Sequence, residues 1–350
     1  MNVLSLFDGM SCAQLALQKA GINTTNYYAS EVDKYAIKVT QANFPKTVQL
    51  GDVQQVTTDQ VGDIDLLVGG SPCQGFSFAG KQLNFEDPRS KLFFEYVRLL
   101  KELKPKYYIL ENVRMAKQSQ DVISEQLGVE PIAINSNLVS AQNRYRLYWT
   151  NISFDMPKDK GIVLADIIED GMVDRNKSHC LDANYFKGGN LKSYFEKHRR
   201  QLVFKSGRLV NRRLDEKGVR KDYDLSIPNQ PRLEVRQDDK TNCLTTVQKD
   251  SVVVSGCIQV GEADVKGHDI LKRVYSPKGK SPTITAHAAK GSAPKIIDEL
   301  TWRKLTPLEC ERLQTVPDNY TNHVSNTQRY KMLGNGMTVD IIASILGGIK

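Results

Sequence analysis

The stretch Asp65-Leu66-Leu67-Val68-Gly69-Gly70-Ser71-Pro72-Cys73 decides the fold class, because a strand-forming run ends abruptly in a loop. The apolar residues 66–68 predict a buried strand, and the glycines and proline that follow predict a turn. Glycines at such a strand end let a ligand approach the backbone closely, and proline stiffens the chain before the thiol. A Pro-Cys pair alone is more often a turn with an incidental cysteine, so other features must decide.

The same pattern recurs on both sides of this stretch. Further strands are predicted at 3–7, 27–30 and 107–110, and helices are predicted at 12–20, 33–42 and 92–103, with Asp33 as a possible cap. The stretch Thr306-Pro307-Leu308-Glu309 predicts another helix start, with Thr306 as its cap. Such alternation favours an α/β fold with a Rossmann-like, mostly parallel, doubly wound sheet and a second, smaller domain. Ligands bind beyond the carboxyl ends of the strands in such sheets. Asp8, Glu31, Cys73 and Glu111 are all predicted to lie there.

The composition is that of a globular protein. The chain has 350 residues, of which 40% are hydrophobic and 25% are charged. It contains no run of about 18 or more apolar residues, so no membrane span is expected. Its N-terminus lacks the pattern of a signal peptide. The six cysteines are scattered without metal-ligand spacing, so a reduced protein without disulfides or metal is expected.

The net charge of +8 is concentrated in one part of the chain. Residues 171–300 carry 25 Lys and Arg against 16 Asp and Glu, whereas the rest of the chain carries 23 against 24. The segment 192–221 alone has 11 basic and 3 acidic residues. This segment is either a solvated basic face or a region that binds a polyanion such as nucleic acid. Two domains are therefore predicted, 1–160 with 302–350 and 161–301.

Charged residues follow two further strands. Glu111 could act as an acid or hydrogen-bond partner for a bound base, although a capping or surface glutamate is the simpler interpretation. Arg144 and Arg146 lie two residues apart, so in an extended stretch both project from one face. Such a pair suits a phosphate, a carboxylate or a thiolate. Two ordinary surface arginines are the alternative.

The loop Phe7-Asp8-Gly9 follows the first strand and precedes a helix, as in nucleotide-binding sites. Glu31 comes 22 residues after Gly9 and is placed to bind ribose hydroxyls. Asp52 follows a predicted third strand and could bind an adenine amine, although it could equally be a turn aspartate. The glycine signal is weak, because the sequence has no GxGxxG motif here.

The order and spacing of these motifs are more specific than any one of them. The motifs are Pro72-Cys73-Gln74, Glu111-Asn112-Val113, Gln142-Asn143-Arg144-Tyr145-Arg146 and Gly334-Asn335-Gly336-Met337. In this order they resemble the DNA (cytosine-5-)-methyltransferase family over nearly the whole chain apart from 160–300. The compact length is similar to that of bacterial and phage members. Residues 4–9 and 71–73 are also similar to the eukaryotic de novo subgroup.

This resemblance implies transfer of a methyl group from S-adenosylmethionine to C5 of a flipped-out cytosine in a specific sequence of double-stranded DNA. Cys73 would attack C6 of the cytosine and form a covalent adduct. Glu111 would hold and protonate the ring at N3. Arg144 and Arg146 would orient the loop and stabilise the adduct.

The resemblance also implies a site for S-adenosylmethionine. Phe7 would pack on the adenine, Glu31 would bind the ribose and Asp52 would bind the adenine amine. The expected cofactor-binding residues are Phe7, Asp8, Gly9, Glu31, Val32, Asp52, Val53, Pro72, Leu92, Asn335 and Gly336. The sequence departs from the family at Ser11, where glycine is usual, and at Ser5, where aspartate is common. These departures leave the detailed cofactor contacts open.

Residues 161–301 would form the target-recognition domain, and their basic excess suits DNA. The resemblance further implies a monomer in the cytoplasm of a bacterium or a phage-infected host. Three alternatives remain: an RNA cytosine-5 methyltransferase of the same fold, a catalytically silent DNA-binding relative and a dinucleotide oxidoreductase. The intact Cys73, Glu111, Arg144 and Arg146 argue against the silent relative. The missing GxGxxG motif argues against the oxidoreductase.

Overall fold

The computed structural model describes residues 1–71, 88–187, 191–204, 206–213, 220–221, 223–228, 230–234, 251–253, 258–262, 273–276, 295–296 and 302–349. The chain divides into two compact units. The first comprises Met1–Ile167, Lys177–Gly188 and Thr306–Lys350, and the second comprises Ile168–Asn176 and Gly189–Leu305. Relative to the predicted domain bounds, 161–167 and 177–187 lie in the first unit, and 302–305 lie in the second.

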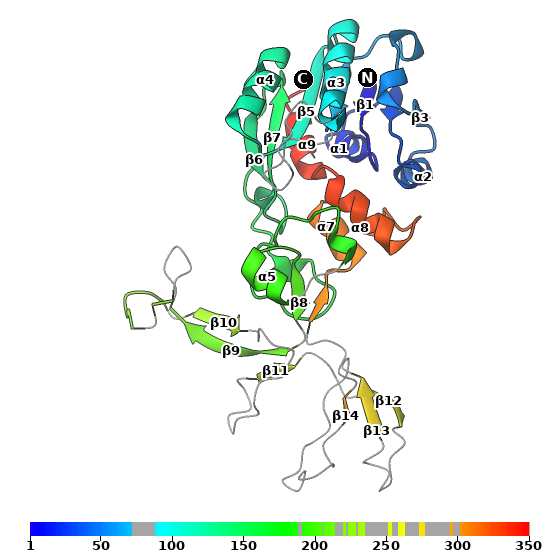
Figure 1. Ribbon diagram of the computed structural model, residues 1–350. Coiled ribbons are helices and arrows are strands. Elements are labelled where there is room, and N and C mark those ends of the chain that lie inside the picture. Colours follow the sequence, from blue (N-terminus) through cyan, green and yellow to red (C-terminus); the bar gives the residue numbers. More distant parts are fainter. Residues whose placement is uncertain are drawn as a thin grey trace, which may run out of the picture. The chain divides into compact units, whose positions relative to one another are not determined.

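A seven-stranded sheet with the order β3-β2-β1-β4-β5-β7-β6 forms the centre of the first unit (Figure 1). Its strands are β1 (Asn2–Leu6), β2 (Asn26–Ser30), β3 (Val48–Gln49), β4 (Leu66–Gly69), β5 (Tyr107–Val113), β6 (Ile132–Asn135) and β7 (Tyr145–Thr150). Strands β1 to β5 pair in parallel, whereas β7 runs antiparallel to both β5 and β6. The predicted Rossmann-like, mostly parallel α/β fold is therefore confirmed.

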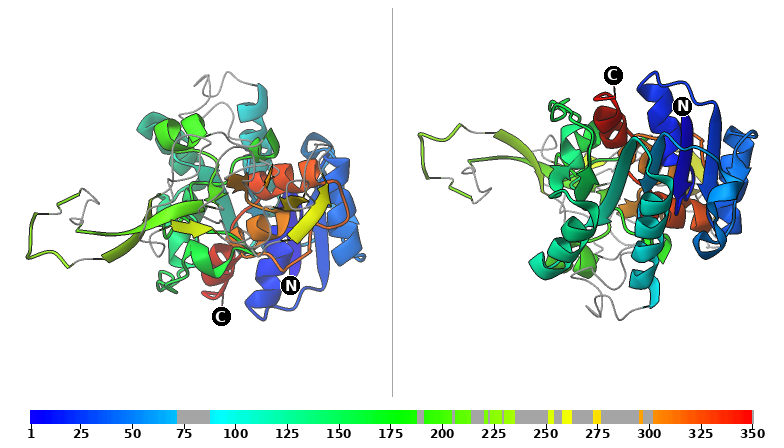
Figure 2. Two further views of the ribbon diagram at one scale, coloured as in Figure 1. Left: turned by 90° about the horizontal axis from the view of Figure 1, so that it is seen from below. Right: turned by 90° about the horizontal axis from the view of Figure 1, so that it is seen from above.

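The helices of the first unit lie on both faces of this sheet and, for α7 and α8, beyond the ends of its strands (Figure 1). They are α1 (Cys12–Lys19), α2 (Lys34–Asn43), α3 (Pro88–Leu103), α4 (Lys117–Leu127), α7 (Pro307–Leu313), α8 (Asn326–Asn335) and α9 (Val339–Leu346). Helices α3 and α4 lie on one face, and α1 and α9 lie on the other (Figure 2). On the α3 face, Phe93 and Tyr96 join Leu4 and Leu67 in one buried cluster. Burial of such side chains is the main favourable contribution to folding. None of the described helices is long and apolar enough to cross a membrane.

Two helix starts that the sequence predicts are confirmed. The Asp33 carboxylate accepts a hydrogen bond from Tyr35 N at 3.0 Å and caps α2. At α7, the Thr306 hydroxyl accepts from Glu309 N at 3.1 Å, and the Glu309 carboxylate accepts from Thr306 N at 2.7 Å. This reciprocal pair satisfies two backbone groups that the helix itself leaves without partners.

The predicted end of the strand at residue 110 is wrong. Strand β5 continues to Val113, because β7 pairs antiparallel with 109–113 and supplies hydrogen-bond partners beyond the end of β4. Glu111 therefore lies within a strand, opposite Tyr148, and not in the loop that follows it.

The second unit is rich in short strands. It contains α5 (Leu191–Lys197), β8 (Leu202–Phe204) and β15 (Trp302–Lys304), and the two strands pair antiparallel. One small sheet consists of β9 (Ser206–Arg212), β10 (Gln230–Glu234) and β11 (Ser251–Val253). Another consists of β12 (Ile258–Glu262), β13 (Arg273–Ser276) and β14 (Lys295–Ile296). Tyr194, Leu202 and Phe204 form a small buried cluster between α5 and β8.

A buried ion pair in the first unit ties α7 to α8. The Glu311 side chain on α7 is fully buried, and its carboxylate lies 2.9 Å from Arg329 Nη2 on α8. The same carboxylate accepts from the backbone N–H of Asn319 at 2.7 Å and of Thr321 at 2.9 Å. One group thus fixes both helices and the turn between them.

Replacing Arg329 with Met is expected to lower the free energy of unfolding by about 3–5 kcal/mol, because Glu311 would keep a buried charge without its partner. Lys331→Met on the same helix is the matched control. The Lys331–Asp33 pair, 2.7 Å apart, is partly exposed, so its loss should cost about 1 kcal/mol or less. Urea unfolding of both variants measures the difference, and equal losses would contradict the role assigned to Arg329.

Candidate active site

The register of the parallel strands aligns the last residues of β2, β1 and β4 with Leu110 in the middle of β5. One row of paired residues crosses the sheet and consists of Ser30, Leu6, Gly69 and Leu110. The next residues along these strands are Glu31, Phe7, Gly70 and Glu111. Residues from separate motifs therefore lie side by side at one edge of the sheet. The strand order reverses between β1 and β4, and ligands bind at this kind of switch point in open α/β sheets.

The loop after β1 has an unusual backbone. Phe7, Gly9 and Ser11 have positive φ angles of 57°, 58° and 61°. This left-handed conformation is unfavourable for residues with a side chain, so surrounding contacts must hold Phe7 and Ser11 in it. Asp8 provides such contacts, because its carboxylate accepts from the Tyr27 hydroxyl at 2.8 Å and from the Ser11 hydroxyl. The Asp8 side chain is buried, and burial raises its pKa to about 6.

The Glu31 carboxylate connects the end of β2 to this loop. One oxygen accepts from Gly9 N at 2.7 Å, and the other accepts from Val32 N and Asp33 N, both at 2.8 Å. A carboxylate has about four lone-pair positions, so Glu31 can still accept a bond from a ligand. Beside it, the Val32 residue is 72% exposed and offers apolar surface.

The other residues predicted to bind a cofactor have different environments. Leu92 and Phe7 are half-buried against the core cluster and keep part of their surface accessible. Asp52 is exposed and caps the short helix η1 (Val53–Gln55) by accepting from Gln54 N at 3.0 Å. The Val53 side chain lies inside the core cluster. Pro72 and Cys73 lie outside the described residues.

The C-terminal motif adjoins the same loop. A Cβ atom built on Gly336 would lie 3.0 Å from Met10 Cε and 3.2 Å from Cys12 Sγ. A larger residue would therefore push against the loop after β1. Asn335, the last residue of α8, is exposed beside this contact. The motif that was expected to complete the cofactor pocket is thus next to Phe7–Ser11, although it is distant in sequence.

Glu111 faces Gly70 from the neighbouring strand. A Cβ atom built on Gly70 would lie 3.3 Å from Glu111 Oε2. On the other side, Glu111 Oε1 lies 3.0 Å from Arg146 Nε, and the two side chains are 10% and 13% exposed. Burial and the negative charge of Glu111 raise the pKa of Tyr148 on β7, so this phenol stays neutral. Glu111 is thus a nearly buried carboxylate held between a cation and a glycine.

The two predicted arginines have different partners. Arg146 contacts Glu111, whereas Arg144 is only 2% exposed and donates to backbone carbonyls. Its guanidinium lies 2.9 Å from Gly336 O, 3.0 Å from Leu181 O and 3.2 Å from Gly334 O. Arg144 therefore anchors the turn around Asn335.

The sequence interpretation missed a contact at the start of the cysteine loop. Asn112 Nδ2 donates to the Ser71 hydroxyl at 3.1 Å, and both side chains are buried. Ser71 is the last described residue before Pro72 and Cys73. Asn112 therefore fixes Ser71, the residue directly before Pro72 and Cys73 in the sequence. The signal was present in Glu111-Asn112-Val113, of which only the glutamate was interpreted.

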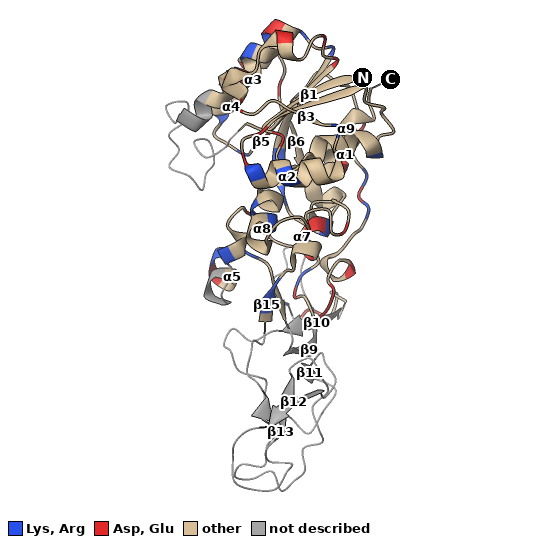
Figure 3. Cartoon of the chain, turned by 90° about the vertical axis from the view of Figure 1, so that its right-hand side faces the viewer, with Lys and Arg blue, Asp and Glu red and all other residues tan. Residues whose placement is uncertain are grey.

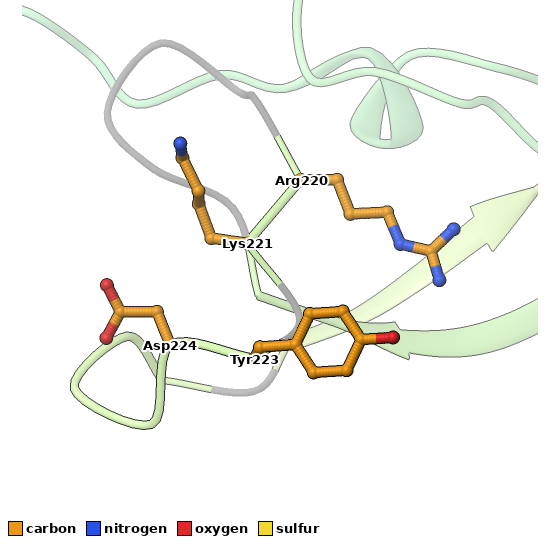
Figure 4. A pocket seen from close by; sticks show the side chains of 4 residues that line it. All are labelled: Arg220, Lys221, Tyr223 and Asp224. Carbon is orange, nitrogen blue, oxygen red and sulfur yellow. The ribbon is translucent and has the colours of Figure 1, made fainter.

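An open pocket on the second unit is lined by Arg220, Lys221, Tyr223 and Asp224 (Figure 4). Tyr223 is fully exposed, and Asp224 accepts from Ser226 N at 3.0 Å within the turn. Figure 3 marks the charged residues, and the structure describes only part of the basic segment 192–221. Cations beside an exposed ring suit a surface that binds a polyanion.

Among the residues that the structure describes, no group of three or more His, Cys, Asp and Glu side chains could hold a metal ion. The motifs at this edge of the sheet supply carboxylates, arginines and a cysteine. These same motifs can be compared with those of known proteins.

The whole chain, residues 1–350, matches the family described as C-5 cytosine-specific DNA methylase. It is 31% identical to the orphan methyltransferase M.Rho11sI of Bacillus phage rho11s, over 85% of this chain and 69% of that protein. It is 28% identical to the type II methyltransferase M.HhaI of Haemophilus parahaemolyticus, over 99% of this chain and 93% of that protein.

Solved structures agree in fold. The Entamoeba histolytica methyltransferase EhMeth has a TM-score of 0.58 at 15% identity, and the match covers 99% of this chain and 97% of that one. A likeness at such low identity shows the fold alone. The family match, in contrast, spans both units and all the motifs at the strand ends. This chain therefore belongs to the C-5 cytosine-specific DNA methylases and is a DNA cytosine-5 methyltransferase.

Proposed function

We propose that this enzyme transfers a methyl group from S-adenosylmethionine to C5 of a flipped-out cytosine in a specific sequence of double-stranded DNA, with Cys73 as the nucleophile. The observation that carries the proposal is the row of strand ends. Glu31, Phe7 and Gly70 directly follow the adjacent strands β2, β1 and β4, and Glu111 lies in β5 beside Gly70. Cys73 follows Gly70 by three residues. Residues suited to bind a nucleoside and residues suited to bind a base thus lie side by side at the carboxyl ends of the parallel strands.

The described residues at β1 and β2 fit the methyl donor. Glu31 keeps acceptor capacity for ribose hydroxyls, and Phe7 offers a partly accessible ring for the adenine. Asp52 would accept from the adenine amine. The rest of the site would come from Asp8, Gly9, Val32, Val53, Pro72, Leu92, Asn335 and Gly336. When bound, S-adenosylmethionine supplies an electrophilic methyl group on its sulfonium.

The protein's part in the chemistry is to activate C5 of cytosine, which is a poor nucleophile in the free base. The Cys73 thiolate would add to C6, and Glu111 would hold N3 and give it a proton, so that C5 becomes enamine-like. Once C5 carries the methyl group, the C5 proton leaves to a base and the C6–S bond breaks. The thiolate is restored, and N3 returns its proton to Glu111. Because these atoms are hidden in a duplex, the cytosine must leave the stack.

Arg146 would position Glu111 for this task. Its Nε lies 3.0 Å from Glu111 Oε1, yet among the described residues that oxygen accepts no hydrogen bond. The contact is therefore an ion pair without hydrogen-bond alignment, in which Oε1 is buried against Arg146. Arg144 would act less directly, by holding the turn that contains Asn335.

Residues 161–301 would recognise the DNA. Lysines and arginines mostly contact phosphates and position the duplex, while a few side chains read the base edges. In the described part of this segment, Lys221 and Tyr223 are exposed beside each other in one pocket, which suits a nucleic-acid surface. The relatives come from bacteria and their phages. We accordingly propose a monomer that acts on DNA in a bacterial cytoplasm.

Cys73→Ala is expected to abolish methyl transfer, because no covalent bond to C6 can form, while binding to a DNA duplex stays measurable. Transfer of radiolabelled methyl groups and gel-shift titration check the two properties. Cys180→Ser serves as the control, since Cys180 is exposed, belongs to none of the catalytic motifs, and serine keeps an acceptor for the contact with Arg144 Nη1. Methyl transfer by the Cys73→Ala enzyme would rule out the mechanism.

Glu111→Gln is expected to slow single-turnover methylation by about 10²–10⁴-fold, since the amide keeps the shape but cannot deliver a proton. Glu125→Gln, an exposed position on α4, changes the same charge away from the strand ends and should leave the rate unchanged. Rapid-quench measurements with saturating DNA separate the two. A Glu111→Gln enzyme as fast as the control would remove Glu111 from the catalytic step.

Exchange of residues 161–301 for those of a relative with another target is expected to change the methylated sequence. Bisulfite sequencing of DNA from cells that produce each protein identifies the modified sites. The same preparations, assayed on transcribed RNA, test the RNA alternative. An unchanged target after the exchange would refute the assignment of this segment to recognition.

A further inference from the structure

The carboxylate of Asp8 takes part in none of the proposed chemical steps. The whole Asp8 residue is only 5% exposed to solvent. One carboxylate oxygen accepts from the Tyr27 hydroxyl at 2.8 Å, and the other accepts from the Ser11 hydroxyl. The carboxylate is therefore turned into the protein. The part of Asp8 that the donor site can use is its backbone.

The surroundings of Asp8 do not favour a negative charge. The groups that face it are Ser5 of β1, Cys12 of α1, Tyr27 of β2, Glu31 directly after β2, and Tyr320 of the turn before α8. All are neutral or acidic, and in the described part of the chain no Lys or Arg is paired with Asp8. Burial without a cation penalises the charged form, which raises the pKa of Asp8 to about 6. Ionised Asp8 therefore destabilises the fold at neutral pH.

The Asp8 carboxylate also restrains the strained loop after β1. Ser11 has a φ of 61° and is held by Asp8 twice, through its hydroxyl and through its N–H, which donates to Asp8 O at 3.1 Å. Tyr27 links the same carboxylate to β2. Glu31 holds Gly9 N at 2.7 Å, and Tyr320 donates to Met10 O at 2.7 Å. Hydrogen bonds with Tyr27, Glu31 and Tyr320 thus fix the loop. Within residues 7–11, Asp8 is the buried charged group.

We propose that Asp8 is a positioning residue for residues 7–11, the methyl-donor loop. Its ionised carboxylate bridges Ser11 and Tyr27 and holds the loop backbone in the shape that binds S-adenosylmethionine, without contact to the donor. This inference rests on the proposed function, because it takes the loop to be part of the donor site. An ionised carboxylate accepts at both oxygens, whereas an amide or a protonated acid turns one of them into a donor.

Calorimetric titration of Asp8→Ala and Asp8→Asn with S-adenosylmethionine and with S-adenosylhomocysteine tests the proposal. Because the two ligands share the nucleoside and differ in the sulfonium charge, both affinities should fall by a similar factor. The expected loss is about tenfold for Asp8→Ala, as for a lost hydrogen bond to a charged group, and smaller for Asp8→Asn. Asp65→Asn is the charge-matched control. Its carboxylate accepts from Asn2 N at 2.7 Å, before β4 at the opposite edge of the sheet.

Tyr27→Phe removes one hydroxyl from the bridge and keeps the test valid if Asp8→Ala does not fold. Its loss of affinity and that of Asp8→Asn should not add in the double variant, because both break the same bridge. The folded-state pKa of Asp8 is raised to about 6, so affinity of the unaltered enzyme should weaken as the pH falls through that value. The Asp8→Asn enzyme should lack this change. Its melting temperature at pH 8 should not be lower, since a buried charge is gone.

Unchanged affinity in all Asp8 variants, or a loss equal to that of Asp65→Asn, would overturn the proposal. A loss confined to S-adenosylmethionine would also overturn it, because the charge would then act on the sulfonium and not on the loop. If the unaltered enzyme binds neither ligand, the donor site itself is wrong and the proposed function fails with it.

Discussion

The register in which β4 pairs with its neighbours is the constraint on which the site depends. Tyr96 on α3 fixes that register, because a Cβ atom on Gly69 would lie 2.8 Å from its ring. Only glycine fits beneath the ring, so the last residue of β4 cannot move along the strand. A slip of one residue would shift β4 by about 3.3 Å and exchange its two faces. Gly70 and Ser71 would then no longer lie beside Glu111 and Asn112.

Buried charges connect this edge to the segment that returns from the C-terminus. Arg144 is nearly inaccessible to solvent, and its guanidinium donates hydrogen bonds to the carbonyl oxygens of Gly334 and Gly336. Glu311 and Arg329 hold the helix that leads into the same turn. A buried polar group with hydrogen-bond partners holds the elements that supply those partners in place. If the contacts break, the group has neither protein nor water to bond to, and this is costly. The C-terminal motif is therefore held beside the loop after β1 by packing inside the first unit.

Local features of the sequence were enough to predict the sheet, the caps at Asp33 and Thr306, and the position of Glu31 at a strand end. Each of these is decided by residues within one turn or one strand. The extension of β5 through Glu111 was missed because it depends on β7, which is distant in sequence and antiparallel. Their spacing predicts that Arg144 and Arg146 project from the same face of an extended stretch. Their partners nevertheless differ, because Arg144 lies under the 334–336 turn whereas Arg146 pairs with Glu111. The inward direction of Asp8 and the burial of Val53 likewise follow from long-range packing.

The departures at Ser5 and Ser11 acquire a physical meaning through Asp8. Ser5, where the family commonly has an aspartate, faces the Asp8 carboxylate and lowers its pKa against the effect of burial. Ser11, where glycine is usual, adopts the left-handed conformation that glycine tolerates better, and its hydroxyl is bound by the same carboxylate. A chain that gives up glycine at the strained position needs a contact to hold that strain. Asp8 supplies the contact, so the three positions are best understood as one unit: the aspartate, the serine that it restrains and the small serine that leaves room beside it.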